Sequence, residues 1–387
     1  MIYLILPCGS NFGWGICGKY LVKELCDLCE ATLITEQFDA GDIGDELDYH
    51  FLKSKLDHQQ KEILTIGKAI QRFDYPVLQA ITDQTLRPWL INLKGTFNAG
   101  YTFFEMNVLP PQSIQNGIDK FDMIVTGSKW CEEVLRNHGL NRVTTIIQGI
   151  DPQLFNPAHS EKELFKDRFV VFSGGKFEFR KGQDIVIRAY KVLQDRHPDV
   201  MLVNAWYNPW PFSMKTMETS PYINCETTET DFLKAVSSIL HANGIDIDRV
   251  VNVLPKKNAQ MARLYKNTDV GLFPNRCEGG TNLVLMEYMA CGKPVIATFS
   301  SGHKDIINPS NSIIIKKMKP LNINSEGILQ AVWDDPDLEE TIAHLEAAYQ
   351  NRDTLKLIGD RAGADLSQMT WKRTGKRFHR LLVNQSV

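Results

Sequence analysis

Three cationic residues near the middle of the chain are suited to binding an anion. The apolar run 169–175 (FVVFSGG) predicts a buried strand that ends in glycines, and Lys176, Arg180 and Lys181 follow it. A helix is predicted over 182–196, so these cations stand beside a helix N-terminus. Cationic side chains next to free backbone N–H groups attract anions. The segment therefore predicts a diphosphate site, and a solvated cluster of surface charges is the alternative.

A polar loop that leads into an apolar helix forms a second group. The loop, within 274–298, consists of Glu278, Gly279, Gly280, Thr281 and Asn282. Glycines let the backbone approach a ligand closely, and the helix that follows presents free N–H groups at its start. Glu287 lies inside this helix (LVLMEYMA), where burial of a carboxylate is costly unless it accepts hydrogen bonds. The sugar hydroxyls of a nucleotide are suitable donors, and a surface-facing glutamate is the alternative.

A glycine-rich loop near the N-terminus matches two phosphate-binding patterns at once. Gly13, Gly15 and Gly18 form the G-x-G-x-x-G of dinucleotide sites and, with the lysine that follows, most of a P-loop. The P-loop interpretation fails because Tyr20 stands where a Ser or Thr must bind Mg²⁺. The dinucleotide interpretation needs an acid after the second strand, and Glu36 lies near that place. We favour a third interpretation, in which Gly13 and Gly15 contact phosphate or sugar oxygens, while a purely structural turn stays open.

Two short motifs could suggest a metal. Asp246 and Asp248 form an Asp-x-Asp motif, but its context (NGIDID) is that of a turn ahead of a strand. Cys26 and Cys29 have no second close Cys or His pair at the spacing that zinc sites use. We therefore predict neither a metal nor a bound cofactor.

The composition is that of a folded enzyme with more than one domain. The chain has 387 residues, of which 43% are hydrophobic and 23% charged, which excludes disordered and fibrous proteins. A net charge of -3 argues against a broad nucleic-acid surface. No apolar run approaches the roughly 20 residues that span a bilayer, and the N-terminus lacks the charged start of a signal peptide. The eight cysteines form no disulfide framework, so we expect a reduced, cytoplasmic protein.

The order of predicted elements indicates two doubly wound α/β domains. Apolar strands alternate with amphipathic helices up to the turn-rich segment 148–163, and the alternation then restarts. We predict domains at 1–160 and 161–365, with 207–229 as an insertion on the second. The remaining 366–387 contains an amphipathic basic helix that we expect to pack back toward the first domain, with membrane contact at most peripheral.

Taken in order, these motifs resemble those of the retaining glycosyltransferases of family four, which have the GT-B fold. The Lys-Gly pair at 181–182 and the segment DVGLFPNRCEGGTNLVLMEYMACGKPVIAT (269–298) resemble the donor half. The segment 121–157, with its capped helix and the hinge QGIDPQLFNP, resembles the end of the first half. Two positions differ from the family pattern. Eight residues rather than seven separate Glu278 from Glu287, and Lys176 replaces a common arginine, which keeps the charge but loses the bidentate fork.

The resemblance implies two Rossmann-like domains facing a cleft and transfer of a sugar from a nucleotide-diphosphate sugar. It implies that Lys176 and Lys181 hold the donor diphosphate, while Gly280, Thr281 and Asn282 add helix N-terminal donors. Glu287 would bind the ribose and Glu278 the transferred sugar. In the first domain, Glu105 follows the strand-like run GYTFF and is a candidate for acceptor contact or deprotonation. The acceptor would be a glycan, a lipid-linked sugar or a small molecule.

Two other functions stay open. A nucleotide-sugar epimerase on the same architecture would use the same cations and glutamates, so that only its products would differ. A non-catalytic nucleotide-sugar-binding protein would bind the donor without transfer. A dinucleotide-dependent dehydrogenase is disfavoured because it leaves the whole segment 274–298 without a role.

Overall fold

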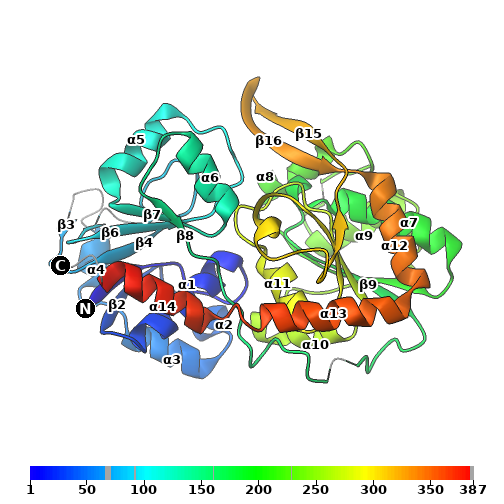
Figure 1. Cartoon of the computed structure of the whole chain (residues 1–387), viewed down its shortest axis with the longest axis horizontal. Coiled ribbons are helices and arrows are strands. Elements are labelled where there is room, and N and C mark those ends of the chain that lie inside the picture. The colour runs from blue at the N-terminus through cyan, green and yellow to red at the C-terminus, as the bar shows by residue number, and fades with distance from the viewer. Residues whose placement is uncertain (66–70, 91–92, 160, 228, 384–387) are drawn as a thin grey trace.

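Two six-stranded parallel sheets form the centres of the two halves of the molecule (Figure 1). The computed structural model describes residues 1–65, 71–90, 93–159, 161–227 and 229–383. The first sheet has the strand order β2-β1-β4-β6-β7-β8 and the second the order β11-β10-β9-β12-β13-β14. Helices lie on both faces of each sheet, as buried parallel strands require. The predicted pair of doubly wound Rossmann-like halves is therefore confirmed.

The first half contains residues up to the turn-rich segment, together with the last helix. Its sheet strands are β1 (Ile2–Ile5), β2 (Ala31–Ile34), β4 (Val77–Ile81), β6 (Asn98–Thr102), β7 (Met123–Thr126) and β8 (Val143–Thr145). A small separate sheet pairs β3 (Gln71–Arg72) with β5 (Leu93–Lys94). Its helices are α1 (Gly13–Cys26), α2 (Ala40–Ile43), α3 (Glu46–Ser54), α4 (Gln60–Thr65), α5 (Pro111–Lys120), α6 (Lys129–Asn137) and α14 (Trp371–Val383).

The second half repeats the pattern and adds a hairpin. Its sheet strands are β9 (Phe169–Gly175), β10 (Val200–Trp206), β11 (Val250–Asn252), β12 (Val270–Phe273), β13 (Val295–Thr298) and β14 (Ile313–Ile315). The hairpin strands are β15 (Met318–Ser325) and β16 (Ile328–Pro336). The α-helices are α7 (Gln183–Arg196), α8 (Pro211–Met214), α9 (Phe232–Ala242), α10 (Met261–Lys266), α11 (Leu283–Ala290), α12 (Leu338–Gln350) and α13 (Arg352–Leu366). Short 3₁₀ helices are η1 (Phe179–Lys181), η2 (Lys215–Thr219), η3 (Ile247–Arg249), η4 (Asn258–Gln260) and η5 (Ser301–Asp305).

Several elements coincide with those predicted from the sequence. Strands β9 and β10 have the predicted limits, because each is a continuous apolar run that is buried on both faces. Ser128 caps α6, since its hydroxyl accepts a hydrogen bond from the Cys131 backbone N–H at 3.2 Å. The hairpin β15–β16 was not predicted. Most of β15 is exposed, so its residues do not form the apolar run that identified the other strands.

The strand order places three loops at the points where ligands bind in such sheets. In each sheet the order reverses beside the first strand, between β1 and β4 and between β9 and β12. Ligands of doubly wound folds bind beyond the carboxyl ends of the strands at these switch points. The loops there are the glycine-rich loop after β1, the cation segment after β9 and the loop 274–282 after β12. These loops are the three that the sequence singled out.

The last helix, α14, lies along α1 of the first half (Figure 1). Its Trp371 ring stacks on Tyr20, with ring centroids 5.3 Å apart and planes 2° apart. Gly375 allows the close approach, because a Cβ there would lie 2.5 Å from the Cβ of Glu24. The apolar face of α14 is therefore used in packing within the chain. Among the described residues, no helix combines the length and apolarity needed to cross a membrane.

The two halves touch directly. The largest cluster of buried apolar side chains has members from both sheets, such as Leu4 and Val170. The hairpin reaches the first half, where the backbone N–H of Val108 donates to the carbonyl of Gln330 at 3.1 Å and the indole of Trp333 donates to the carbonyl of Glu105 at 2.8 Å. These contacts hold the loop that carries Glu105 next to the second half.

Candidate active site

Oppositely charged side chains meet where β9 and β12 end. The Lys181 ammonium lies 2.6 Å from a carboxylate oxygen of Glu278, and the Arg180 guanidinium lies 3.2 Å from the other oxygen. Asn275 adds a hydrogen bond from its amide to Glu278. The cation segment after β9 and the loop after β12 are thus joined at Glu278, as expected for two segments of one site.

Arg180 extends this cluster into the first half. Its guanidinium lies 2.6 Å from Glu178 and 3.3 Å from Glu105, whose loop follows β6. The structure therefore brings Glu105, predicted on the acceptor side, to the donor-side cations. Lys176 is held less tightly, 3.8 Å from Glu178, with 35% of its side chain exposed. Among these cations, Lys176 is the most accessible to an anionic ligand.

The charge state of Glu278 follows from this environment. Burial raises its pKa, but the positive charges of Lys181 and Arg180 outweigh burial and lower the pKa to about 2. Glu278 is therefore a carboxylate at any physiological pH. The structure pairs each of the three cations with a carboxylate.

An aromatic side chain from the insertion covers Lys176. The Lys176 ammonium lies 4.9 Å from the ring centroid of Trp210, a cation–π contact. The ring of Phe12, from the glycine-rich loop of the first half, lies 5.0 Å from Trp210. The insertion at 207–229 therefore joins the glycine-rich loop to the predicted diphosphate site.

The loop at 279–282 is packed against the first half. A Cβ on Gly279 would lie 2.3 Å from the carbonyl oxygen of Phe104, so only glycine fits this contact. The Gly279 carbonyl accepts a hydrogen bond from the Ser128 hydroxyl at 2.6 Å. Gly302 is also confined, since a Cβ there would lie 1.7 Å from the Gly280 carbonyl oxygen, whereas a Cβ on Gly280 would lie 3.1 Å from the Phe103 ring. These glycines fix the position of the loop relative to the acceptor half.

Asn282 begins α11 in a left-handed conformation. Its φ is 63°, and its side-chain oxygen accepts from the backbone N–H of Leu285 at 3.4 Å. Its amide nitrogen lies 3.2 Å from Nε2 of His303. Burial lowers the pKa of His303 to about 4, so this neutral imidazole can accept the amide proton. Thr281 is fully buried and its hydroxyl donates to the sulfur of Met286 at 2.9 Å, so it faces the protein interior.

Glu287 is buried and already holds two hydrogen bonds. Asn258 donates to Oε1 at 2.6 Å, and the Tyr265 hydroxyl donates to Oε2 at 3.1 Å. Burial raises the pKa of Glu287 to about 8, and the hydrogen bonds from Asn258 and Tyr265 oppose that rise. The sequence-based alternative of a surface-facing glutamate is therefore wrong, because only 4% of this residue is exposed.

This environment makes the stability contribution of Glu287 depend on pH. The native carboxyl keeps a proton up to pH values near its pKa of about 8, whereas the unfolded chain releases that proton near 4.5. Stability contributed by Glu287 is therefore present below the unfolded value and lost as the pH rises toward 8. We expect the thermal midpoint of Glu287→Gln, minus that of the wild type, to increase steadily from pH 5 to pH 8. A midpoint difference that stays constant across this range would contradict the prediction.

The glycine-rich loop after β1 is shaped by packing. A Cβ on Gly15 would lie 2.9 Å from Gly9, and one on Gly18 would lie 1.9 Å from the carbonyl oxygen of Pro7. Gly13 is different, because its nearest neighbour would be a methyl group of Leu283 at 3.9 Å. Gly13 therefore lies beside the start of α11, at the meeting of two helix N-termini. Tyr20, which rules out a P-loop, donates to Asp151 of the turn-rich segment at 2.9 Å.

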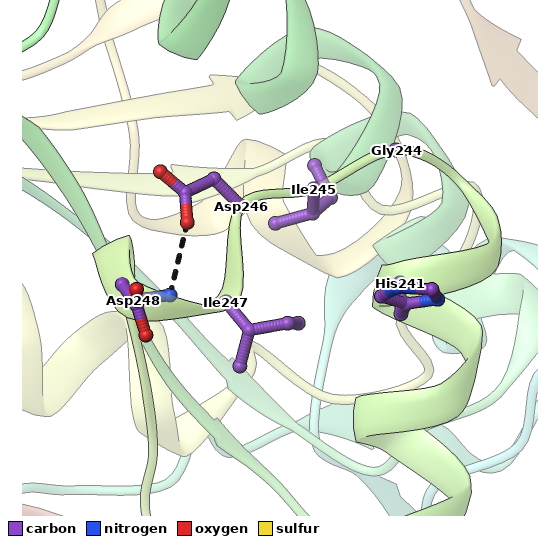
Figure 2. A pocket seen from close by; sticks show the side chains of 6 residues that line it. All are labelled: His241, Gly244, Ile245, Asp246, Ile247 and Asp248. Carbon is purple, nitrogen blue, oxygen red and sulfur yellow. Dashed lines mark hydrogen bonds between the residues drawn. The ribbon is translucent and has the colours of Figure 1, made fainter.

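The Asp-x-Asp motif caps a turn. With His241, the motif lines a hollow of about 440 Å³. The Asp246 carboxylate accepts a hydrogen bond from the backbone N–H of Asp248 at 3.1 Å, the dashed line in Figure 2. Asp246 also pairs with Arg249 at 2.9 Å. In the described part of the chain, no group of three or more His, Cys, Asp or Glu side chains could hold a metal ion.

One buried network beside the site was missed by sequence reasoning. Arg276 is fully buried and forms two hydrogen bonds to Asp184 at 2.9 and 2.8 Å, from the loop after β12 to the start of α7. It also contacts Asp335 at 2.7 Å and the carbonyl of Phe179 at 2.7 Å. The network anchors η1, which carries Arg180 and Lys181. No sequence signal links residues that lie 92 positions apart.

Comparison with known proteins agrees with this geometry. Residues 222–333 match the model of the family described as glycosyl transferases group 1. The chain is 23% identical to a D-inositol 3-phosphate glycosyltransferase of Arthrobacter sp., over 52% of the chain and 44% of that protein. The matched segment, within the second half, is thus similar to the group 1 glycosyltransferases. The chain spans about half the length of the curated relatives it matches, including a GDP-mannose-dependent mannosyltransferase of Corynebacterium glutamicum (23% identity, 55% of the chain, 53% of that protein).

Solved structures show the fold of this chain. Sucrose-phosphate synthase from Thermosynechococcus elongatus superposes with a TM-score of 0.67 at 15% identity, covering 99% of this chain and 98% of the other. The Anabaena protein HepE in complex with UDP-glucose superposes with a TM-score of 0.65 at 14% identity, covering 99% of each chain. Together with the two parallel sheets, these likenesses identify the GT-B fold.

Proposed function

We propose that the protein transfers a sugar from a nucleotide-diphosphate sugar to an acceptor hydroxyl, with retention of anomeric configuration. The observation that supports this proposal is the pairing of Glu278 with Lys181 and Arg180. There the cations after β9 meet the loop that opens α11, at the switch point of the second sheet. The neighbouring HepE structure, which contains UDP-glucose, supports a nucleotide sugar as the donor.

In this proposal the second half binds the donor. Lys176 and Lys181 neutralise the diphosphate, and the start of α11, with Gly280 and Asn282, adds backbone donors. Glu287 accepts from the ribose. As the bond between the anomeric carbon and the phosphate oxygen breaks, the electron pair leaves with the nucleoside diphosphate. The lysines then stabilise that charge.

The first half would present the acceptor. The acceptor oxygen bonds to the anomeric carbon and loses its proton, for which Glu105 is the candidate base on that side. Gly13 lies close enough to α11 for its loop to contact the sugar or diphosphate. We infer a hydroxyl-rich acceptor, since two relatives are named for inositol phosphate and a phosphatidylinositol mannoside. All eight cysteines are free thiols, which supports a reducing, cytoplasmic setting. The relative named for a phosphatidylinositol mannoside supports a role in the synthesis of a glycan or polysaccharide.

A product assay tests this function. UDP-, GDP- and ADP-sugars are incubated with inositol phosphate and with oligosaccharide acceptors, and products are analysed by mass spectrometry and by NMR of the anomeric proton. Transfer of a hexose with the donor's anomeric configuration is expected. Conversion of the nucleotide sugar to its epimer without an acceptor, or inversion at the anomeric carbon, would contradict the proposal.

We expect transfer to persist in excess EDTA. Lys176, Lys181 and the start of α11 supply the positive charge that a divalent ion supplies in metal-dependent transferases. Asp246 is used in capping a turn and pairing with Arg249. Initial rates measured with EDTA, and with EDTA followed by Mn²⁺ or Mg²⁺, check this. Loss of activity that either metal restores would contradict these assigned roles.

A further inference from the structure

Asn258 contacts both halves of the molecule at the predicted ribose site. Its backbone N–H donates to the carbonyl of Ser10, in the glycine-rich loop of the first half, at 3.1 Å. Its side-chain amide donates to Oε1 of Glu287 at 2.6 Å. Only 5% of Asn258 is exposed, so this amide is fixed by protein contacts on both sides.

The hydrogen bonds that Glu287 accepts from the protein leave two of its acceptor sites for a ligand. In its ionised form, which the ribose hydroxyls would favour by donating to it, each oxygen of the Glu287 carboxylate accepts about two hydrogen bonds. Asn258 uses one site on Oε1 and Tyr265 one site on Oε2, so one remains on each oxygen. Two neighbouring acceptor sites match the two neighbouring hydroxyls of a ribose. A deoxyribose or dideoxyribose lacks at least one of these donors.

The cation whose charge acts on Glu287 is already paired with another residue. Lys19 lies in the first half, where its charge acts on Glu287, but its ammonium is paired with Asp48 at 3.2 Å. The orientation of the carboxylate therefore depends on Asn258 and Tyr265. Of these, Asn258 is the residue that also contacts the first half.

We propose that Asn258 is a positioning residue that holds Glu287 in the orientation that accepts both ribose hydroxyls. The inference rests on the proposed function, because it assigns the ribose to Glu287. Glu287 held in this way makes the protein selective for ribonucleotides over nucleotides that lack these hydroxyls. Because Asn258 is also bonded to Ser10, Glu287 keeps this orientation only while the glycine-rich loop stays in place.

The test compares three probes by calorimetry: UDP or GDP, whichever binds the wild type more tightly; its 2′,3′-dideoxy analogue; and inorganic pyrophosphate. The wild type should prefer the ribonucleotide to the dideoxy analogue by at least about tenfold, the scale of a hydrogen bond to a charged group. Asn258→Ala should lose most of this preference while binding pyrophosphate as the wild type does. Asn258→Asp, which keeps the size but sets a second carboxylate against Glu287, should lose it too.

Asn252→Ala is the matched control. Asn252 accepts from Asn204 at 2.6 Å and donates to Ser237 at 3.0 Å, close in the chain to Asn258 but away from Glu287. This variant should keep the full preference. Equal loss of ribonucleotide and pyrophosphate affinity in Asn258→Ala would show a general structural role and overturn the inference, as would an unchanged preference. Failure of the wild type to bind UDP or GDP would instead remove the proposed function, and the inference with it.

Discussion

Glu278→Gln should lower kcat by about a hundredfold, the scale of losing one preorganised electrostatic contact. The substitution keeps the shape of the side chain but removes a carboxylate whose pKa is held near 2 between Lys181 and Arg180. In the proposed function, Glu278 contacts the transferring sugar, and this contact strengthens as positive charge develops there, so the loss falls on the transition state. The nucleoside diphosphate should bind at least as tightly as before, because Lys181 no longer shares its charge with Glu278.

Glu287→Gln is the matched comparison, since it makes the same chemical change at the proposed ribose site. A ribose contact is the same in ground and transition states, so this variant should mainly raise the donor KM. Steady-state kinetics on both variants, with calorimetry for the nucleoside diphosphate, separates the two roles. A larger loss of kcat in Glu287→Gln than in Glu278→Gln would show that these roles are reversed.

Asp184→Ala should destabilise the second half by about 3–5 kcal/mol, the cost of breaking a buried ion pair by removing one partner. The change leaves the guanidinium of Arg276 fully buried without its bidentate partner. Because Arg276 also holds the carbonyl of Phe179, the segment with Arg180 and Lys181 should loosen as well. Thermal and urea unfolding measure the effect.

Asp195→Ala controls for the loss of an acidic residue from the same helix. Asp195 pairs with Lys191 on the surface of α7, and exposed pairs of this spacing contribute only about 0.3–0.5 kcal/mol. Its unfolding midpoint should stay close to that of the wild type. A midpoint for Asp184→Ala as high as that of Asp195→Ala would mean that the buried network does not stabilise this half.

The parts of the fold that follow from local patterns were predictable. Strands β9 and β10 are continuous apolar runs, and Ser128 is an ordinary N-cap, so each could be identified from neighbouring residues. Strand β15 of the hairpin is mostly exposed, and local hydrophobicity does not distinguish such a strand from a loop. Its contacts with the loop that carries Glu105 exist only in the folded chain.

The residues of the candidate site could be predicted from the sequence, but the ion pairs between them could not. The positions of Lys176 and Lys181 after a strand were visible, since their spacing is local. The carboxylates that pair with the cations come from three separate segments, which hold Glu105, Glu178 and Glu278. Partly buried cations need such partners, because an unpaired buried charge is strongly unfavourable. Their identity depends on topology, which a motif does not contain.

The central claim is that a nucleoside diphosphate binds between the segment after β9 and the start of α11. Calorimetric titration of UDP and GDP tests this claim most directly. The wild type should bind one of them, and Lys181→Ala should weaken binding by about 10- to 150-fold, the scale of a hydrogen bond to a charged group. Lys176→Ala should act in the same direction. Nucleotide affinity that is unchanged in both variants would contradict the placement of the donor at this site.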